Sequence, residues 1–174
     1  MSAPRHAEPL RSLCTRLRKC PSDLIAQSFQ RITRHEGRAM AFSEMRDETR
    51  RELTVIAEGR IDFDAIRAHL ARERDVGALG FRELIDARQA TPDVTPQEVR
   101  LIVDLVRAEA RRKVLGPTAV VVSTELAFGM LRMLEQLVED VALIRPFRDY
   151  AAAVEWLATQ SGPDDHPRPR LFIA

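Results

Sequence analysis

The 174-residue sequence predicts a single α/β domain built on a mixed, mostly parallel sheet of about five strands. Short apolar runs alternate with helix-periodic segments between residues 41 and 158. The continuous apolar run Thr118–Ser123 is typical of a strand that helices cover on both faces. Long connections between the later runs favour parallel crossovers. We therefore expect the order ββαβαβαβα, with an antiparallel hairpin at one edge and helices over the sheet.

The first two strands are predicted to form that hairpin. Phe42–Arg46 and Arg51–Ala57 flank a short polar segment that is typical of a hairpin loop. Gly59 is expected to end the second strand. Asp62 then caps the first helix of the domain. His69 lies on the flank of this helix, where we expect a solvated or boundary histidine.

The third strand is predicted at Phe81–Asp86. The next helix has the clearest start in the chain, because Thr95 can cap it and Pro96 suits its first position. Glu98 completes a capping box with Thr95. This helix is expected to run to about Arg112.

The last two helices flank a final strand. Ser123 or Thr124 is expected to cap a helix that buries one apolar stripe. The stripe comprises Leu126, Met130, Met133, Leu134 and Leu137. Val141–Phe147 is the last predicted strand, and Pro146 places it at an edge because proline cannot donate to a ladder. Asp149 is expected to cap the closing helix.

Composition limits the partners and the compartment. A net charge of +1 gives no footprint for nucleic acid, and none is expected as a partner. No apolar run is long enough for a transmembrane segment, and the N-terminus lacks the pattern of a signal peptide, so a cytoplasmic location is expected. Cys14 and Cys20 have no further cysteine or histidine pair at zinc-ligand spacing, so incidental thiols are expected, with a redox pair as the alternative.

Both ends of the chain differ in composition from the middle. Residues 1–40 hold eight basic and three acidic side chains. We expect a flexible basic extension or short helix there, with a weak surface anchor and a misplaced start before Met40 as alternatives. Residues 159–174 form a tail rich in proline and charge. The domain itself is therefore predicted to span residues 41–158.

Several stretches of the middle segment resemble the SpoIIAA-like, STAS-type family of bacterial proteins. They are the strand that ends at Gly59, Phe81–Asp86, Val120–Ser123, Phe128–Met133 and Phe147–Leu157. The resemblance implies the fold of anti-sigma-factor antagonists and of the cytoplasmic domains of sulfate transporters. Antagonists of this type bind a regulator and are switched by phosphorylation of a serine within an Asp-Ser pair. The matching loop here begins at Asp93 and has Thr95 in place of that serine, which favours a capping hydroxyl over a phosphorylation site.

The resemblance also implies a second kind of function, because other SpoIIAA-like members are regarded as binders of lipid-like or other apolar molecules. Phe128, Met130, Met133 and Trp156 would line such a crevice between helices. Ordinary core packing is the alternative, since methionine suits both roles.

No sequence motif supports an enzyme: the chain has no phosphate-binding glycine loop, no nucleophile elbow and no zinc-protease motif. No cofactor and no metal are therefore expected. Arg88 and Ser123 follow two predicted strands, at the edge where parallel sheets bind ligands, and could hold an anion. The alternative is that Arg88 pairs with Asp86.

Two functions follow from the sequence. The first is a non-enzymatic module that binds a lipid-like small molecule through Phe128, Met130, Met133, Trp156, Arg88 and Ser123. The second is a regulatory module that docks a protein partner through the loop at Asp93–Pro96, with Asp93 and Thr95 as contacts, and through the following helix. A homodimer is left open.

Overall fold

The structure, a computed structural model, describes residues 40–160. Its elements are β1 (Met40–Asp47), β2 (Glu52–Asp62), α2 (Phe63–Asp75), β3 (Arg82–Asp93), α3 (Pro96–Ala110), β4 (Thr118–Val121), α4 (Glu125–Val138), β5 (Ile144–Phe147) and α5 (Tyr150–Thr159). The predicted basic extension and the predicted tail fall almost entirely outside these residues.

The strands form one five-stranded sheet in the order β1-β2-β3-β4-β5. β1 is antiparallel to β2, whereas the pairs β2–β3, β3–β4 and β4–β5 are parallel. The predicted fold class and element order are therefore confirmed. β5 lies at an edge of the sheet, as its proline required.

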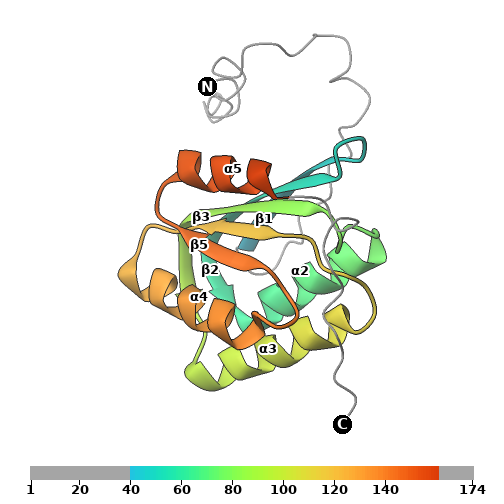
Figure 1. The fold of residues 1–174 in the computed structure, drawn as a ribbon. Coiled ribbons are helices and arrows are strands. Elements are labelled where there is room, and N and C mark those ends of the chain that lie inside the picture. The colour runs from blue at the N-terminus through green and yellow to red at the C-terminus, as the bar shows by residue number, and fades with distance from the viewer. Residues whose placement is uncertain (1–39, 161–174) are drawn as a thin grey trace, which may run out of the picture. The chain divides into compact units, whose positions relative to one another are not determined.

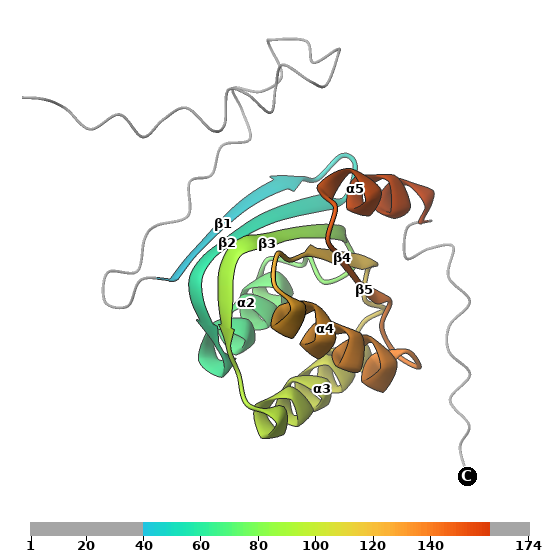
Figure 2. The same cartoon turned by 90° about the vertical axis from the view of Figure 1, so that its left-hand side faces the viewer.

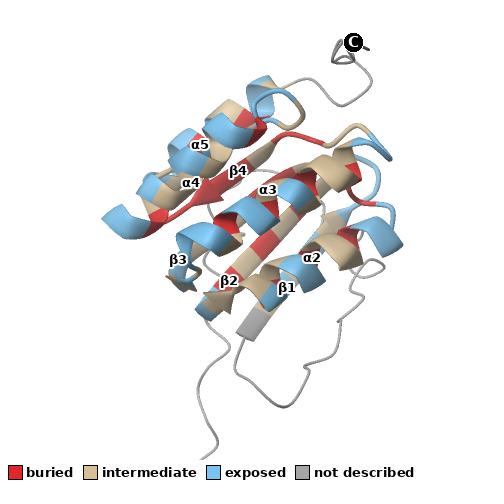
Figure 3. Ribbon diagram, turned by 90° about the horizontal axis from the view of Figure 1, so that it is seen from below, coloured by how far each residue is buried: buried red, intermediate tan, exposed pale blue. Residues whose placement is uncertain are grey.

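Helices cover both faces of the sheet. Figures 1 and 2 show α5 on one face and α2, α3 and α4 on the other. β4 shows the consequence, because its side chains alternate between the two layers. Ala119 and Val121 pack on the side of α5, and Val120 packs with Ala127 of α4. Seen from the α2–α4 side, buried residues follow the strands and the inner faces of the helices, and exposed residues lie on the outer faces (Figure 3).

β2 and β3 are longer than predicted. β2 passes through Gly59, which has a φ of 77°, and ends at Asp62. The register between the two strands shifts after Ile56, where β3 carries one extra residue. Such a bulge bends and twists a sheet without ending it. Among the described residues, β3 therefore continues beyond Asp86 with β2 as its one neighbour, and we call this part of the pair, 58–62 with 89–93, the ribbon.

Four polar residues cap the helices as predicted. The side chain of Asp62 accepts from the N–H of Ala65 at the start of α2. Thr124 and Asp149 accept in the same way from Ala127 and Ala152, at the starts of α4 and α5. At α3, Thr95 and Glu98 form the reciprocal capping box. Each cap satisfies an N–H group that the first helical turn leaves without a backbone partner.

The predicted buried stripe of α4 is wrong in part. Leu126 is 64% exposed, and Met133 and Leu137 are also exposed. The residues that face the sheet are instead Ala127 and Val138, with the half-buried Leu131 and Leu134 between them. The helix is rotated from the predicted phase. Apolar residues occur on most of its circumference, so its sequence permits more than one phase.

Gly116 allows a close approach between two loops before β4. Its N–H donates to the carbonyl of Leu79 at 2.8 Å. A Cβ at this position would overlap the carbonyl oxygen of Phe81. Glycine is therefore required here for space. Among the described residues, no helix is long and apolar enough to cross a membrane.

Candidate functional site

A cavity of about 230 Å³ lies between the sheet and the layer of α2, α3 and α4. Most of its wall is apolar and comes from every layer around it, including Ile66 of α2, Ile85 of β3, Ile102 of α3 and Met130 of α4. The ribbon contributes too, through Ala90 and its neighbours. An apolar cavity of about 150 Å³ already holds benzene, so this one is large enough for a somewhat larger hydrocarbon group.

One part of the cavity wall is polar. His69 and Glu73 lie one turn apart on α2, and Glu83 faces them from β3. All three side chains are buried, with residue exposures of 6–7%. Nε2 of His69 lies 2.9 Å from Oε1 of Glu83 and 3.0 Å from Oε1 of Glu73. We call His69, Glu73 and Glu83 the buried triad.

Residues around the buried triad fix its orientation. Nδ1 of His69 faces Oε1 of Glu44 on β1 at 3.4 Å. Arg72 donates to that same carboxylate at 2.8 Å. Oε2 of Glu83 accepts from the hydroxyl of Thr118 at 3.2 Å. The imidazole ring also stacks on Phe42, with centroids 5.2 Å apart and planes 12° from parallel. Strands β1, β3 and β4 and helix α2 thus all contribute to one arrangement.

Proximity of the charges shifts the pKa values in opposite directions. Burial disfavours the charged imidazole, but the facing carboxylates of Glu44, Glu73 and Glu83 raise the pKa of His69 to about 12. Burial and the negative charge of Glu83 raise the pKa of Glu73 to about 8. For Glu83, burial is the largest single effect and acts upward, but the contacts with His69, Glu73 and Thr118 together lower the pKa. At neutral pH the site without a bound cation therefore holds a proton on Glu73 as well as on His69.

Two polar atoms of this site have no hydrogen-bond partner among residues 40–160. They are Nδ1 of His69 and Oε1 of Glu73. A single N–H at Nε2 is well aligned only with Glu83, so Glu73 stays unsatisfied although it is close. Buried polar atoms without partners are costly and uncommon in proteins, and each needs an explanation.

The sequence prediction for His69 is therefore wrong. The histidine is neither solvated nor at a boundary, because β1 and β3 bring two carboxylates and an aromatic ring around it. Only the spacing of His69 and Glu73 on one helix face, and a glutamate at an inward position of an apolar strand, gave local indications of the site.

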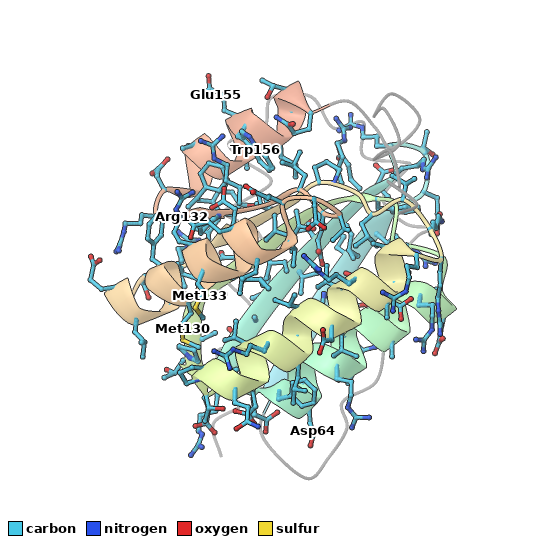
Figure 4. All side chains as sticks on the ribbon, turned by 60° about the horizontal axis from the view of Figure 1, so that its bottom comes forward. Asp64, Met130, Arg132, Met133, Glu155 and Trp156 are labelled. Carbon is cyan, nitrogen blue, oxygen red and sulfur yellow. The ribbon has the colours of Figure 1, made fainter. Side chains whose placement is uncertain are left out.

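The four residues predicted to line an apolar crevice do not gather in one place. Met130 alone among them lines the cavity. Phe128 lies under the guanidinium of Arg148, 4.5 Å from the ring centroid. Met133 is on the exposed side of α4, and Trp156 of α5 packs against Phe147 of β5 (Figure 4). Phe128 and Trp156 thus pack in separate clusters, on opposite faces of the sheet.

Arg88 and Ser123 meet, but each has a partner within the chain. Arg88 donates two hydrogen bonds to Asp86, at 2.8 and 2.6 Å, and its guanidinium lies over the ring of Tyr150. Ser123 donates to the carbonyl of Arg88 at 2.8 Å. Contact with Arg88 lowers the pKa of Asp86, so the pair stays ionised at neutral pH. This geometry agrees with the alternative that Arg88 pairs with Asp86.

The loop from Asp93 to Pro96 is exposed, and its polar groups are engaged. Asp93 forms an ion pair with Arg60 across the ribbon. The hydroxyl of Thr95 accepts from the N–H of Glu98 at 3.2 Å and donates to the carboxylate of Glu98 at 2.7 Å. Thr95 therefore serves as the helix cap that the sequence favoured.

No protein-family model and no curated protein matches the sequence. Among solved structures, one match is an uncharacterised protein of the DUF3478 family with a SpoIIAA-like fold from Shewanella loihica PV-4. It is 16% identical, with 68% of this chain and 93% of that chain covered and a TM-score of 0.47. Another is the anti-sigma factor antagonist SpoIIAA in its unphosphorylated form, at 18% identity, 69% and 100% coverage and a TM-score of 0.43. These likenesses concern the fold alone, and the matched structures include the SpoIIAA-like fold that the sequence analysis named as a resemblance.

Proposed function

We propose that this protein is a non-enzymatic module that binds an apolar or amphipathic small molecule in the cavity between the sheet and α2–α4. The observation that carries this proposal is the cavity itself, because it is large, mostly apolar and polar at one place. Ligand sites in proteins commonly combine apolar walls with a few converging polar groups. Met130 is the one residue of the predicted crevice that takes part.

The polar place in the wall favours an amphipathic ligand over a pure hydrocarbon. The buried triad provides hydrogen-bonding groups toward the cavity, whereas the remaining wall offers mainly hydrophobic contact. A molecule with a short hydrocarbon part and one polar end would satisfy both. Unfilled apolar space costs about 24 cal/mol per Å³ in protein cores, so a ligand that fills it gains stability for the complex.

A fluorescence titration with N-phenyl-1-naphthylamine tests this proposal. The dye is neutral and apolar, and we expect enhanced fluorescence with saturation at one dye per chain. Native mass spectrometry of gently purified protein provides a second readout, a bound small molecule. Absence of both a bound molecule and saturable dye binding would refute the proposal.

A matched pair of variants locates the binding. Ala127 of α4 lines the cavity, whereas Ala153 of α5 is fully buried on the opposite face of the sheet. Ala127→Leu should occupy part of the cavity and weaken dye binding at least tenfold. Ala153→Leu should leave binding unchanged in the fraction of protein that stays folded. Equal affinity in both variants would place the dye elsewhere.

A second candidate function is docking of a regulatory protein at Asp93, Thr95 and the outer face of α3. The observation that favours it is Leu101, which is 44% exposed on α3. The name of the second matched structure describes a regulator, and it fits this candidate better than ligand binding. We expect a dedicated partner to be lost on Leu101→Glu and Thr95→Glu while the circular dichroism spectrum stays native. Retention of the partner by both folded variants would exclude this surface.

A further inference from the structure

The buried triad has the composition and shape of a metal site. Its donor atoms are one imidazole nitrogen and two carboxylate oxygens, and all three lie within 4.8 Å of one another. In tetrahedral zinc sites with bonds of about 2.0–2.1 Å, neighbouring donor atoms are about 3.3 Å apart. Nε2 of His69 lies 2.9 and 3.0 Å from the two carboxylate oxygens. An outward shift of a few tenths of an ångström would therefore accommodate a cation.

We propose that Nε2 of His69 and one carboxylate oxygen each from Glu73 and Glu83 bind a divalent first-row transition-metal cation at the polar part of the cavity wall. This inference concerns the same polar part of the wall that the ligand-binding proposal uses, but it does not depend on that proposal, since metal binding is measured without an organic ligand.

The unpartnered oxygen of Glu73 points to a missing cation. Glu73 is 6% exposed, and its Oε1 has no hydrogen-bond partner although it lies against Nε2 of His69. The N–H at Nε2 serves Glu83 alone, whereas a cation that displaces the protons on Nε2 and on Glu73 can accept a lone pair from all three donors. Binding would satisfy all three residues of the triad at once.

The surroundings of the triad match the outer shell of a metal site. A histidine ligand commonly donates its second ring N–H to a carboxylate, which fixes the tautomer and leaves the lone pair on the other nitrogen. Glu44 lies on that side of the ring, with its Oε1 3.4 Å from Nδ1 but not hydrogen-bonded to it, and Arg72 holds Glu44 in place. Thr118 similarly holds the second oxygen of Glu83.

The charges also balance with a divalent cation. Glu73 and Glu83 would be neutralised by the metal, and Arg72 neutralises Glu44. A nitrogen and two carboxylate oxygens suit Zn²⁺, Fe²⁺ or Mn²⁺, and thiolate-seeking cations such as Cu⁺ are excluded by this donor set. Because all three donors line the cavity, the cavity provides a route of entry and room for a further ligand on the metal.

The test is a titration of chelator-stripped, full-length protein with Zn²⁺ alone. Calorimetry measures both the binding and the unfolding temperature. We expect one Zn²⁺ per chain and a higher unfolding temperature. Co²⁺ in place of Zn²⁺ should give the visible absorption of a protein-bound, low-coordinate ion. Sub-stoichiometric binding, or saturation with no change in unfolding temperature, would overturn the proposal.

Three conservative variants separate a metal site from a merely structural cluster. Glu73→Gln keeps the volume of the side chain and mimics the neutral acid, so the fold should persist while affinity falls more than about 100-fold. Glu44→Gln should weaken binding about 10–100-fold, as outer-shell changes do. Glu109→Gln is the matched control, because Glu109 is equally buried and has an unpartnered oxygen but pairs with Arg74 away from the triad. Equal affinity of all three variants would place the cation elsewhere.

Failure of this test and failure of the proposed function are distinguishable. Zn²⁺ binding is measured without dye, and dye binding is measured in the presence of chelator. Loss of Zn²⁺ binding in Glu73→Gln with unchanged dye affinity would leave both proposals standing. Dye binding without any Zn²⁺ binding would refute the metal site alone.

Discussion

Filling the cavity should stabilise the protein, which is the reverse of what overpacking does in a dense core. Ala127 is 8% exposed and lines the cavity from the first turn of α4. Leucine adds three carbons there, each worth about 0.8 kcal/mol when buried. Ordering the longer side chain costs about 0.5–1 kcal/mol. We therefore expect Ala127→Leu to raise the free energy of unfolding by roughly 1.5–2 kcal/mol.

The same substitution on the other face of the sheet should have the opposite sign. Ala153 has no exposed area and packs against Leu84, Ala119 and Val121 under α5. Extra carbons in a filled core cost about 1–3 kcal/mol. Both alanines lie near the start of a helix, so differences in helix propensity largely cancel in the comparison.

Urea unfolding of delipidated, chelator-treated protein measures both effects. Midpoints should move in opposite directions while the m-value stays constant, since a change in slope would mean that the unfolded or native ensemble changed. If Ala127→Leu destabilises as much as Ala153→Leu, the space beside Ala127 is filled in solution. The reasoning that leads from the cavity to a ligand would then fail.

Three further predictions concern stability. Glu73 and His69 have folded pKa values of about 8 and about 12, above their ordinary 4.5 and 6.5, so folding takes up protons. Metal-free protein should therefore lose stability as the pH rises from 5 to 8, by up to about 1.4 kcal/mol per pH unit for each titrating group, and Glu73→Gln should flatten the part between pH 5 and 6.5 in urea melts. Gly116→Ala should lower the free energy of unfolding by about 1–3 kcal/mol, whereas Gly129→Ala, in open space on α4, should raise it by roughly 0.5–1 kcal/mol; equal effects would contradict the crowding at the first position. Thr95→Ala should cost about 1 kcal/mol through loss of the cap, and an unchanged urea midpoint would show that the cap contributes nothing.

Local patterns in the sequence predicted most of the fold. Capping residues such as Asp62 and Thr95 act within one turn of their helices, so their effect can be deduced without knowing the tertiary structure. The strand β4 could also be predicted from its continuous apolar run, because both of its faces are buried. The ends of the strands were harder to predict. Gly59 indicates the end of a strand, but β2 continues through it because a bulge beside it accommodates its backbone conformation.

The rotation of α4 could not be deduced from its sequence. Leu126 and Met133 are as apolar as the residues that the helix buries, so the hydrophobic pattern permits more than one phase. The small residue Ala127 faces the sheet, where a larger side chain would have been expected from composition alone. Packing against β4 and β5 decides the phase, and that information is not local.

The buried triad depends even more on distant parts of the chain. His69 and Glu73 are neighbours on one helix, but Glu83 and Glu44 reach them from strands on either side of β2. Sequence spacing cannot show that four ionisable groups converge when they lie on three different elements, β1, α2 and β3. Each residue alone is ordinary for a charged surface, and only the assembled sheet makes the group unusual.

The ribbon of β2 and β3 has a consequence for how anything reaches the interior. Past Asp86, the described part of the chain places no strand beside β3 on the side of β4, so β3 has fewer backbone hydrogen bonds there than in the rest of the sheet. We expect the amide protons of Gln89, Ala90, Thr91 and Asp93 to exchange with solvent sooner than those of β4, because a strand that is paired on one side opens at lower free energy than a central strand. Ala90 and Pro92 belong to the cavity wall, so each such opening would also uncover the interior. Local opening of the ribbon would thus widen access to the cavity.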